Sequence, residues 1–236
     1  MTGNKTPRPN LNRATSKALG GKRNDRGTLL LWIGAVAVVV ALIVAIAVTV
    51  VRGADNKKHE NAAVGLNNPA AATATGAASA PPWAAPTDAT GAVRRAGLPM
   101  LAEEGAVEHI HIHLDVLVDG KPVAVPANIG VDRSTGKMSP LHTHDNSGVV
   151  HIESPVKRKY SLGELFSEWN VSLSEGNIGA LRVADGQALH AYVDGQLRQG
   201  NPAAITFNEH DEVALVYGPA GSKTTPPSSY SFGNGE

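Results

Sequence analysis

The sequence predicts an α+β protein: a mostly antiparallel β-sheet domain with one short helix, preceded by a single transmembrane helix and a disordered stalk. Three observations predict this fold. Apolar and polar residues alternate through Val107–Val118, which is the period of a half-buried strand. Asp-Gly pairs at 119–120 and 194–195 are strong signals for tight hairpins. Ser161 and Glu164 form a capping box ahead of a short apolar pattern with helical spacing.

The first 51 residues predict a cytoplasmic arm and a membrane anchor. Residues 1–28 are polar and carry seven Lys or Arg against one acid, so we expect a disordered basic arm. Leu29–Val51 has no charged residue, and as a helix it would span about 34 Å, against roughly 30 Å of hydrocarbon. The preceding positive charges place the N-terminus in the cytoplasm. The run is longer than a signal peptide's apolar region, which favours an uncleaved, single-pass anchor over a cleaved signal peptide.

The rest of the chain predicts a linker, a domain and a tail. Between Asn61 and Ala92, 13 of 32 residues are Ala, with prolines interspersed, so we expect residues 52–97 to be a flexible Ala/Pro/Thr-rich stalk. Residues 98–221 then form an extracytoplasmic, His-rich β domain, attached to the cell membrane by the anchor. Residues 222–236 are polar and predict a disordered tail.

Within the domain, each element follows from a local pattern. The strand over 107–118 turns back at Asp119-Gly120, and Pro122 and Pro126 make the return strand over 121–131 an edge strand. Leu162, Leu165, Phe166 and Trp169 predict a helix over about 162–170, with its apolar side in the core. The remaining expected elements are a second hairpin over 141–153, strands near 180–184, 188–193 and 213–217, and a weaker strand near 204–207.

Composition excludes several classes of function. The whole chain has zero net charge, but residues 105–221 carry eight Lys or Arg and fourteen Asp or Glu, a net charge of −6. Such a domain is a poor nucleic-acid binder, because phosphate neutralisation needs clustered Lys and Arg. The chain contains no cysteine, which excludes disulfides, thiolate metal sites and cysteine nucleophiles.

The most informative feature is a group of alternating histidines. Six of the nine histidines fall within the 43 residues from 109 to 151. Residues two apart on a strand share a face, and imidazole is the commonest metal ligand in proteins. Two neighbouring hairpins could therefore bring several imidazoles together on one face. The candidate metal ligands are His109, His111, His113, His142, His144 and His151.

The second hairpin allows a test by parity. If Leu141, Thr143, Val150 and Ile152 face the core, the other face carries His142, His144, His151 and Glu153. Pairing Thr143 with Val150 then places His142 directly opposite His151, with Cβ atoms about 5 Å apart. His190 and His210 are distant in sequence, and we interpret them as surface or turn residues.

An imidazole-rich site without Cys or a well-placed Met favours Zn first and Cu(II) second. Asp115, Asp145 and Glu153 are candidates to orient a ligand imidazole or to supply an oxygen ligand.

Three functional interpretations remain open. The first is a metal-binding or metal-stabilised module of the cell envelope. The second is a metal-dependent hydrolase or hydratase with a three-histidine site and Glu153 as general base. The third is an adhesion or assembly module in which the histidines are incidental or sense pH. The expected partners are the membrane and an unidentified protein or envelope component, with no nucleic acid.

Three segments of the sequence resemble segments of a known group of proteins. The strand EHIHIHLDVLVDG, the hairpin SPLHTHDNSGVVHIESP and the following SLGELF resemble a group of uncharacterised membrane-anchored or secreted proteins of actinobacteria and other prokaryotes. The resemblance covers about 60 residues well. It implies a similar architecture, a metal site and an envelope location, but no reaction. The positions that it carries over are His109, His111, His113, His142, His144, Asp145, His151 and Glu153.

Overall fold

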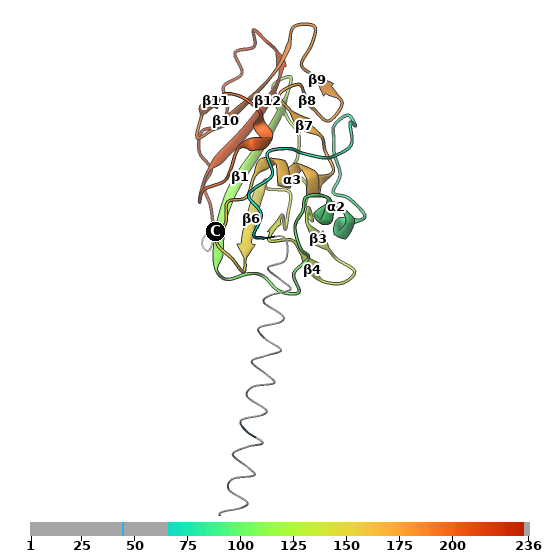
Figure 1. Ribbon diagram of the computed structural model, residues 1–236. Coiled ribbons are helices and arrows are strands. Elements are labelled where there is room, and N and C mark those ends of the chain that lie inside the picture. Colours follow the sequence, from blue (N-terminus) through green and yellow to red (C-terminus); the bar gives the residue numbers. More distant parts are fainter. Residues whose placement is uncertain (1–43, 45–65, 234–236) are drawn as a thin grey trace, which may run out of the picture. The chain divides into compact units, whose positions relative to one another are not determined.

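The fold is built around a seven-stranded sheet with the strand order β11-β10-β12-β1-β6-β5, to which β2 is added at β1 (Figure 1). The computed structural model describes Val44 and residues 66–233, and the latter belong to one unit, Ala54–Glu236. The expected basic arm and the expected membrane span lie outside the described residues, apart from Val44. Among the described helices, none has the length and apolar character needed to cross a bilayer.

Two short helices and two small sheets accompany the main sheet, so the domain is α+β, with mostly antiparallel pairing. The strands of the main sheet are β1 (Glu108–Val118), β2 (Lys121–Pro122), β5 (Leu141–His142), β6 (Val149–Ser154), β10 (Gln187–Val193), β11 (Gln196–Arg198) and β12 (Glu212–Pro219). The small sheets contain β3 (Val131–Asp132) and β4 (Lys137–Met138), and β7 (Leu173–Ser174), β8 (Asn177–Ile178) and β9 (Leu181–Arg182). The helices are α2 (Ala89–Arg95) and α3 (Leu162–Trp169), with a 3-10 turn at Pro202–Ala204.

Both Asp-Gly turns are confirmed. Asp119 and Gly120 have φ values of 51° and 75°, and Asp194 and Gly195 have 51° and 73°, as a type I′ turn requires at its two central positions. The return strand after the first turn is shorter than expected, because only Lys121–Pro122 pairs with β1. Its prolines lack the N–H that a longer ladder needs. The weak strand expected near 204–207 is wrong in type: the chain there forms the 3-10 turn and a single bridge from Ser161 to Thr206.

One pairing in the sheet departs from the antiparallel expectation. β1 and β12 run parallel, in a register that joins His113 to Glu212 and Val118 to Tyr217. The first and last strands of the sheet in sequence thus lie side by side (Figure 1). A parallel contact between strands so far apart has no local sequence signal, since neither a hairpin turn nor a short crossover joins them.

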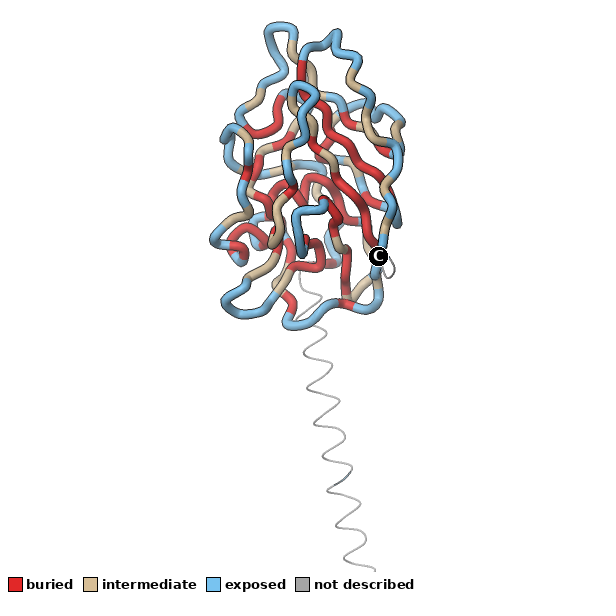
Figure 2. The backbone as a smooth tube through the Cα atoms, turned by 180° about the vertical axis from the view of Figure 1, so that it is seen from behind, coloured by how far each residue is buried: buried red, intermediate tan, exposed pale blue. Residues whose placement is uncertain are grey.

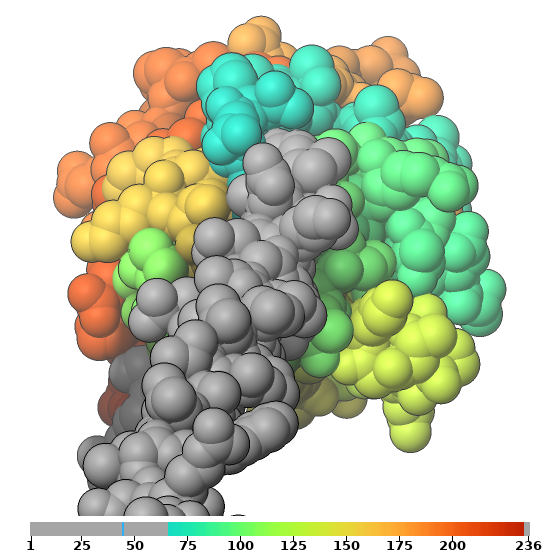
Figure 3. Space-filling model, turned by 60° about the horizontal axis from the view of Figure 1, so that its bottom comes forward, coloured from blue at the N-terminus to red at the C-terminus, as the bar shows by residue number. Residues whose placement is uncertain are grey.

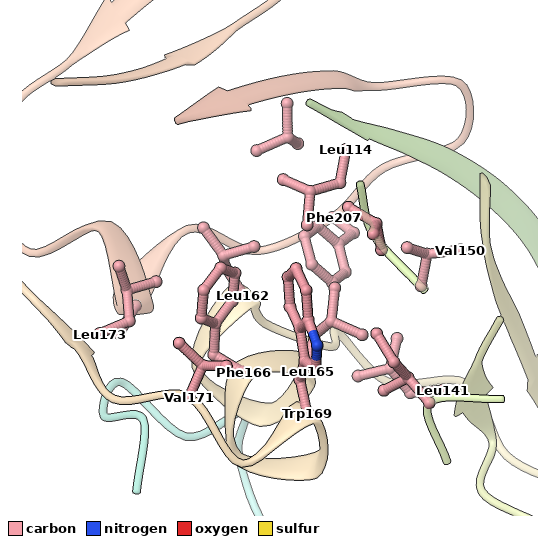
Figure 4. Close-up of a cluster of buried hydrophobic side chains, with 14 of the residues drawn as sticks. Leu114, Leu141, Val150, Leu162, Leu165, Phe166, Trp169, Val171, Leu173 and Phe207 are labelled. Carbon is pink, nitrogen blue, oxygen red and sulfur yellow. The ribbon is translucent and has the colours of Figure 1, made fainter. Parts of the chain in front are cut away.

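Helix α3 supplies much of the core, and its start is confirmed. The side chain of Ser161 accepts from the Glu164 N–H, the Glu164 side chain accepts from the Ser161 N–H, and Asn170 ends the helix in the left-handed region. Leu162, Leu165, Phe166 and Trp169 are fully or almost fully buried against residues of the sheet such as Leu114, Leu141 and Val150 (Figure 4). The helix therefore covers one face of the sheet, which leaves the opposite face for the histidines.

The expected stalk is partly wrong. Residues from Leu66 onward pack into the domain: Leu66 is 2% exposed, Trp83 is 4% exposed, and the Trp83 ring meets Trp169 edge to face, with centroids 5.8 Å apart. The chain also forms α2, capped by Asp88, whose carboxylate accepts from the Gly91 N–H at 2.7 Å. Buried and exposed stretches alternate along the backbone of the domain (Figure 2), and residues 66–97 contain both.

Residues near the start of this segment contact a part of the domain that is distant in sequence. In Figure 3 the cyan stretch that begins at residue 66 lies beside the orange chain, and Asn201 Nδ2 donates to the Ala72 carbonyl at 2.9 Å. The boundary of the domain is therefore at or before Leu66, not at residue 98. The expected disordered tail also needs correction, because residues 222–233 lie along the domain and the Tyr230 ring stacks on His113, with centroids 3.8 Å apart.

Candidate metal centre

The register of three strands builds the site. β1 pairs with β6 so that His111 faces His151 and His109 faces Glu153. β5 pairs with β6 so that His142 lies opposite His151, as the parity argument predicted. Directly paired residues point to the same face of a sheet. His111, His151 and His142 therefore form one row across three strands, and His109 and Glu153 form the next row.

The four residues of the second hairpin converge on one point. His142, His144, His151 and Glu153 each offer a ligand atom, and these atoms all lie within 4.8 Å of one another. The rings of His142 and His151 are nearly parallel, with centroids 5.4 Å apart, and the His144 ring stands at 73° to that of His151. This group, called the hairpin cluster below, can hold a metal ion.

His142 is oriented for coordination through Nε2. Its Nδ1 lies 2.9 Å from the Ser139 carbonyl oxygen, which can only accept, so Nδ1 carries the hydrogen. Burial, as the main cause, lowers the pKa of His142 to about 4, so the ring is neutral at pH 7. Nε2 then presents a lone pair toward His144. A backbone carbonyl that fixes the tautomer in this way is typical of metal-binding histidines.

The distances between donors fit a shared ion. Nε2 of His142 and Nε2 of His144 are 3.2 Å apart. Two donors of one tetrahedral zinc, each about 2.0–2.1 Å from the ion, lie about 3.3 Å apart. His142 is fully buried whereas His144 is exposed, so solvent reaches the cluster from the side of His144.

Glu153 supplies the negative charge of the cluster. Burial raises its pKa, but the hydrogen bond with His151 and the positive charges of neighbouring imidazoles outweigh that effect and lower it to about 2. Its Oε1 lies 3.3 Å from His151 Nδ1, whereas its Oε2 is buried without a hydrogen-bond partner. A buried, ionised oxygen without a donor is favourable only beside a cation.

His109 and His111 form a second group with the same carboxylate. The ligand atoms of His109, His111 and Glu153 also lie within 4.8 Å of one another. Nε2 of His109 is 3.6 Å from Glu153 Oε1, and Nε2 of His111 is 3.0 Å from Nδ1 of His151. This group, called the strand cluster below, adjoins the hairpin cluster through both contacts.

His113 is separated from the other five histidines. Its Nδ1 lies 2.8 Å from Glu212 Oε2 and its Nε2 lies 2.9 Å from the Ser147 carbonyl. Both ring nitrogens thus meet acceptors, as a protonated imidazolium requires. Although burial lowers the pKa of His113, the hydrogen bond and charge of Glu212 outweigh it and raise the pKa above 6.5. His113, Asp115 and Glu212 lie close enough for a cation, but their hydrogen bonds are those of an ion pair.

The two expected aspartates lie outside both clusters. Asp115 Oδ2 is 3.7 Å from His113 Nδ1, so it accompanies the ion pair. Asp145 accepts a hydrogen bond from the Ser147 N–H at 2.8 Å, which closes the turn of the hairpin. Hydrogen bonds with the Ser147 side chain, and secondarily with its backbone, lower the pKa of Asp145. Of the three acids named from the sequence, Glu153 alone belongs to the hairpin cluster.

Two residues behind His142 carried no signal in the sequence. The Ser139 hydroxyl donates to Glu168 Oε1 at 2.5 Å, and Glu168, on α3, is fully buried. Burial raises the pKa of Glu168 well above its ordinary value, which favours the protonated carboxyl. The pair fixes the backbone that holds His142 Nδ1. Glu168 lies within an ordinary helical pattern, so only the tertiary contact shows that it lies behind His142.

Comparisons of the chain with protein-family models, with curated proteins and with solved structures find no significant match. The assignment of function therefore rests on the geometry of the histidine face.

Proposed function

We propose that the domain binds a transition-metal ion through His142, His144 and His151, with Glu153 as anionic ligand or countercharge. Zn(II) is the first assignment and Cu(II) the second, because imidazole-rich sites without sulfur suit both. The observation that carries the proposal is the convergence of the hairpin cluster, in which four ligand atoms lie within 4.8 Å and His142 is held ready to coordinate.

The proposed location follows from the sequence. The apolar segment Leu29–Val51, preceded by seven basic residues, would anchor the chain and place the domain outside the cytoplasm. We therefore propose a membrane-anchored, extracytoplasmic module that binds a metal ion for storage, transfer or structural stabilisation.

Binding has more support than hydrolysis. A general base works best with a pKa near the working pH, whereas the pKa of Glu153 is lowered to about 2. A pocket of about 280 Å³ on the same domain is lined by residues such as Asp115 and Ser147 and by none of the cluster histidines. Glu153 is thus better suited to hold a cation than to activate water.

The test uses the full-length chain, purified in detergent, stripped with a chelator and dialysed against Zn(II) or, separately, Cu(II). We expect at least one tightly held equivalent, measured by elemental analysis. His142→Ala and His144→Ala should each lose about one equivalent; the second variant removes an exposed side chain and so spares the core. His190→Ala, which removes an exposed histidine of β10, is the matched control. Equal metal content in all four proteins would contradict the proposal.

A further inference from the structure

We infer that the histidine face holds two metal ions, with Glu153 shared between them. This inference rests on the proposed function and extends it. The hairpin cluster would bind the first ion, and the strand cluster of His109, His111 and Glu153 would bind the second. Glu153 is common to both sets of ligand atoms.

The number of donors exceeds what one ion uses. A tetrahedral zinc takes four ligands, and the hairpin cluster already supplies four. His109 and His111 are additional, and their ligand atoms group with Glu153 rather than with His142 and His144. The register accounts for His109, which lies opposite Glu153 in the row beyond His111 and His151.

Glu153 has the properties of a bridging carboxylate. Its side chain is 5% exposed, and Oε1 lies within 3.6 Å of His109 and within 3.3 Å of His151. Oε2 is buried and has no hydrogen-bond partner. Buried polar atoms without a partner are rare in proteins, and a bound ion would supply the partner that this oxygen lacks. If both clusters shared Glu153, the two ions would lie about 3.5–4 Å apart.

The second ion would have open coordination positions. The side chain of His109 is 54% exposed, so solvent reaches the strand cluster directly. Three protein ligands leave at least one position for water. We therefore expect weaker binding at the strand cluster than at the hairpin cluster.

A one-ion site is the alternative. In that arrangement His111 would serve as the hydrogen-bond partner of His151, since His111 Nε2 and His151 Nδ1 are 3.0 Å apart. His109 would then have no part in metal binding, and the chain would hold a single equivalent.

Metal stoichiometry decides between the two. The full-length chain in detergent is titrated with Zn(II), and bound metal is measured after dialysis. We expect two equivalents for the unmodified chain and for His190→Ala, and one for His109→Ala. One equivalent in all three proteins would overturn the second ion and leave the proposed function intact. No bound metal in any of them would overturn both.

Copper provides a readout of proximity. Loaded with two equivalents of Cu(II), the unmodified chain should show the broadened, half-field resonance of two coupled ions in its electron paramagnetic resonance spectrum. His109→Ala should show the spectrum of an isolated Cu(II). Two uncoupled Cu(II) signals in the unmodified chain would exclude a shared carboxylate.

Discussion

The Ser139 hydroxyl donates to Glu168 Oε1 across 2.5 Å, directly behind the carbonyl that holds His142. This contact joins helix α3 to the segment just before β5, the strand that carries His142. It places a fully buried carboxyl behind the hairpin cluster. We therefore expect Glu168 to affect stability through its proton.

Replacing Glu168 by Gln should change how stability depends on pH. Burial raises the pKa of Glu168 well above 4.5, so the folded protein keeps a proton that the unfolded chain releases. The contribution of Glu168 to stability therefore falls as pH rises above about 4.5. Glu168→Gln has no such proton, so its unfolding free energy relative to the unmodified chain should rise from pH 4 to pH 8.

Urea unfolding in the presence of a chelator measures this difference without metal. Glu175→Gln, at an exposed position, is the control and should give no comparable trend. A difference for Glu168→Gln that stays constant across the pH range would show that the carboxyl is ionised in the fold.

His113 should titrate above the ordinary range of histidine. Its hydrogen bond with Glu212 and the charge of that carboxylate outweigh burial and raise the pKa of His113 above 6.5. The stability that His113 contributes as an imidazolium is therefore fully present below pH 6.5 and is lost as pH rises through the pKa of His113 in the folded state. We expect His113→Gln to cost about 2 kcal/mol at pH 6 and less at pH 9.

Proton NMR of the His113 ring measures its pKa. Unfolding of His113→Gln at pH 6 and pH 9 measures the loss of stability. A midpoint at or below 6.5 for His113 would mean that Glu212 does not hold it as an imidazolium. In that case the ring would be neutral, and His113 would return to the set of candidate metal ligands.

Replacing Trp83 by Ala tests the corrected domain boundary. Trp83 is 4% exposed, and its carbonyl accepts from Trp169 Nε1 at 3.2 Å. Truncation of a buried Trp should lower the unfolding free energy by about 3–5 kcal/mol. Thr87→Ala, an exposed position of the same segment, should change it by less than about 0.5 kcal/mol. Equal stability of the two variants would restore the view of this segment as a stalk.

Local chemistry made much of the fold predictable. The two Asp-Gly turns, the capping box at Ser161 and the opposition of His142 and His151 depend on neighbours in sequence or on the two-residue period of a strand. These signals act over a few residues, so the sequence carries them directly. They were sufficient to locate the hairpin cluster and its carboxylate.

The features that the sequence did not predict depend on contacts between residues far apart in the chain. The parallel pairing of β1 with β12 brings Glu212 to His113, 99 residues away, and groups this histidine with two carboxylates instead of with the other histidines. The Ala- and Pro-rich composition before residue 98 indicated a stalk, but the few large apolar side chains within it, such as Trp83, are enough to dock it. The overall composition of a segment gives little weight to a few large apolar side chains, so it does not predict that they dock the segment.

X-ray absorption at the zinc edge of the Zn-loaded, full-length chain tests the central claim most directly. We predict a first shell of nitrogen and oxygen donors at about 2.0–2.1 Å, with the outer-shell scattering of at least two imidazoles per zinc on average. His142→Ala should lose part of that imidazole scattering, while His190→Ala should retain it. A shell of oxygen donors alone, unchanged by either substitution, would contradict a metal centre on the histidine face.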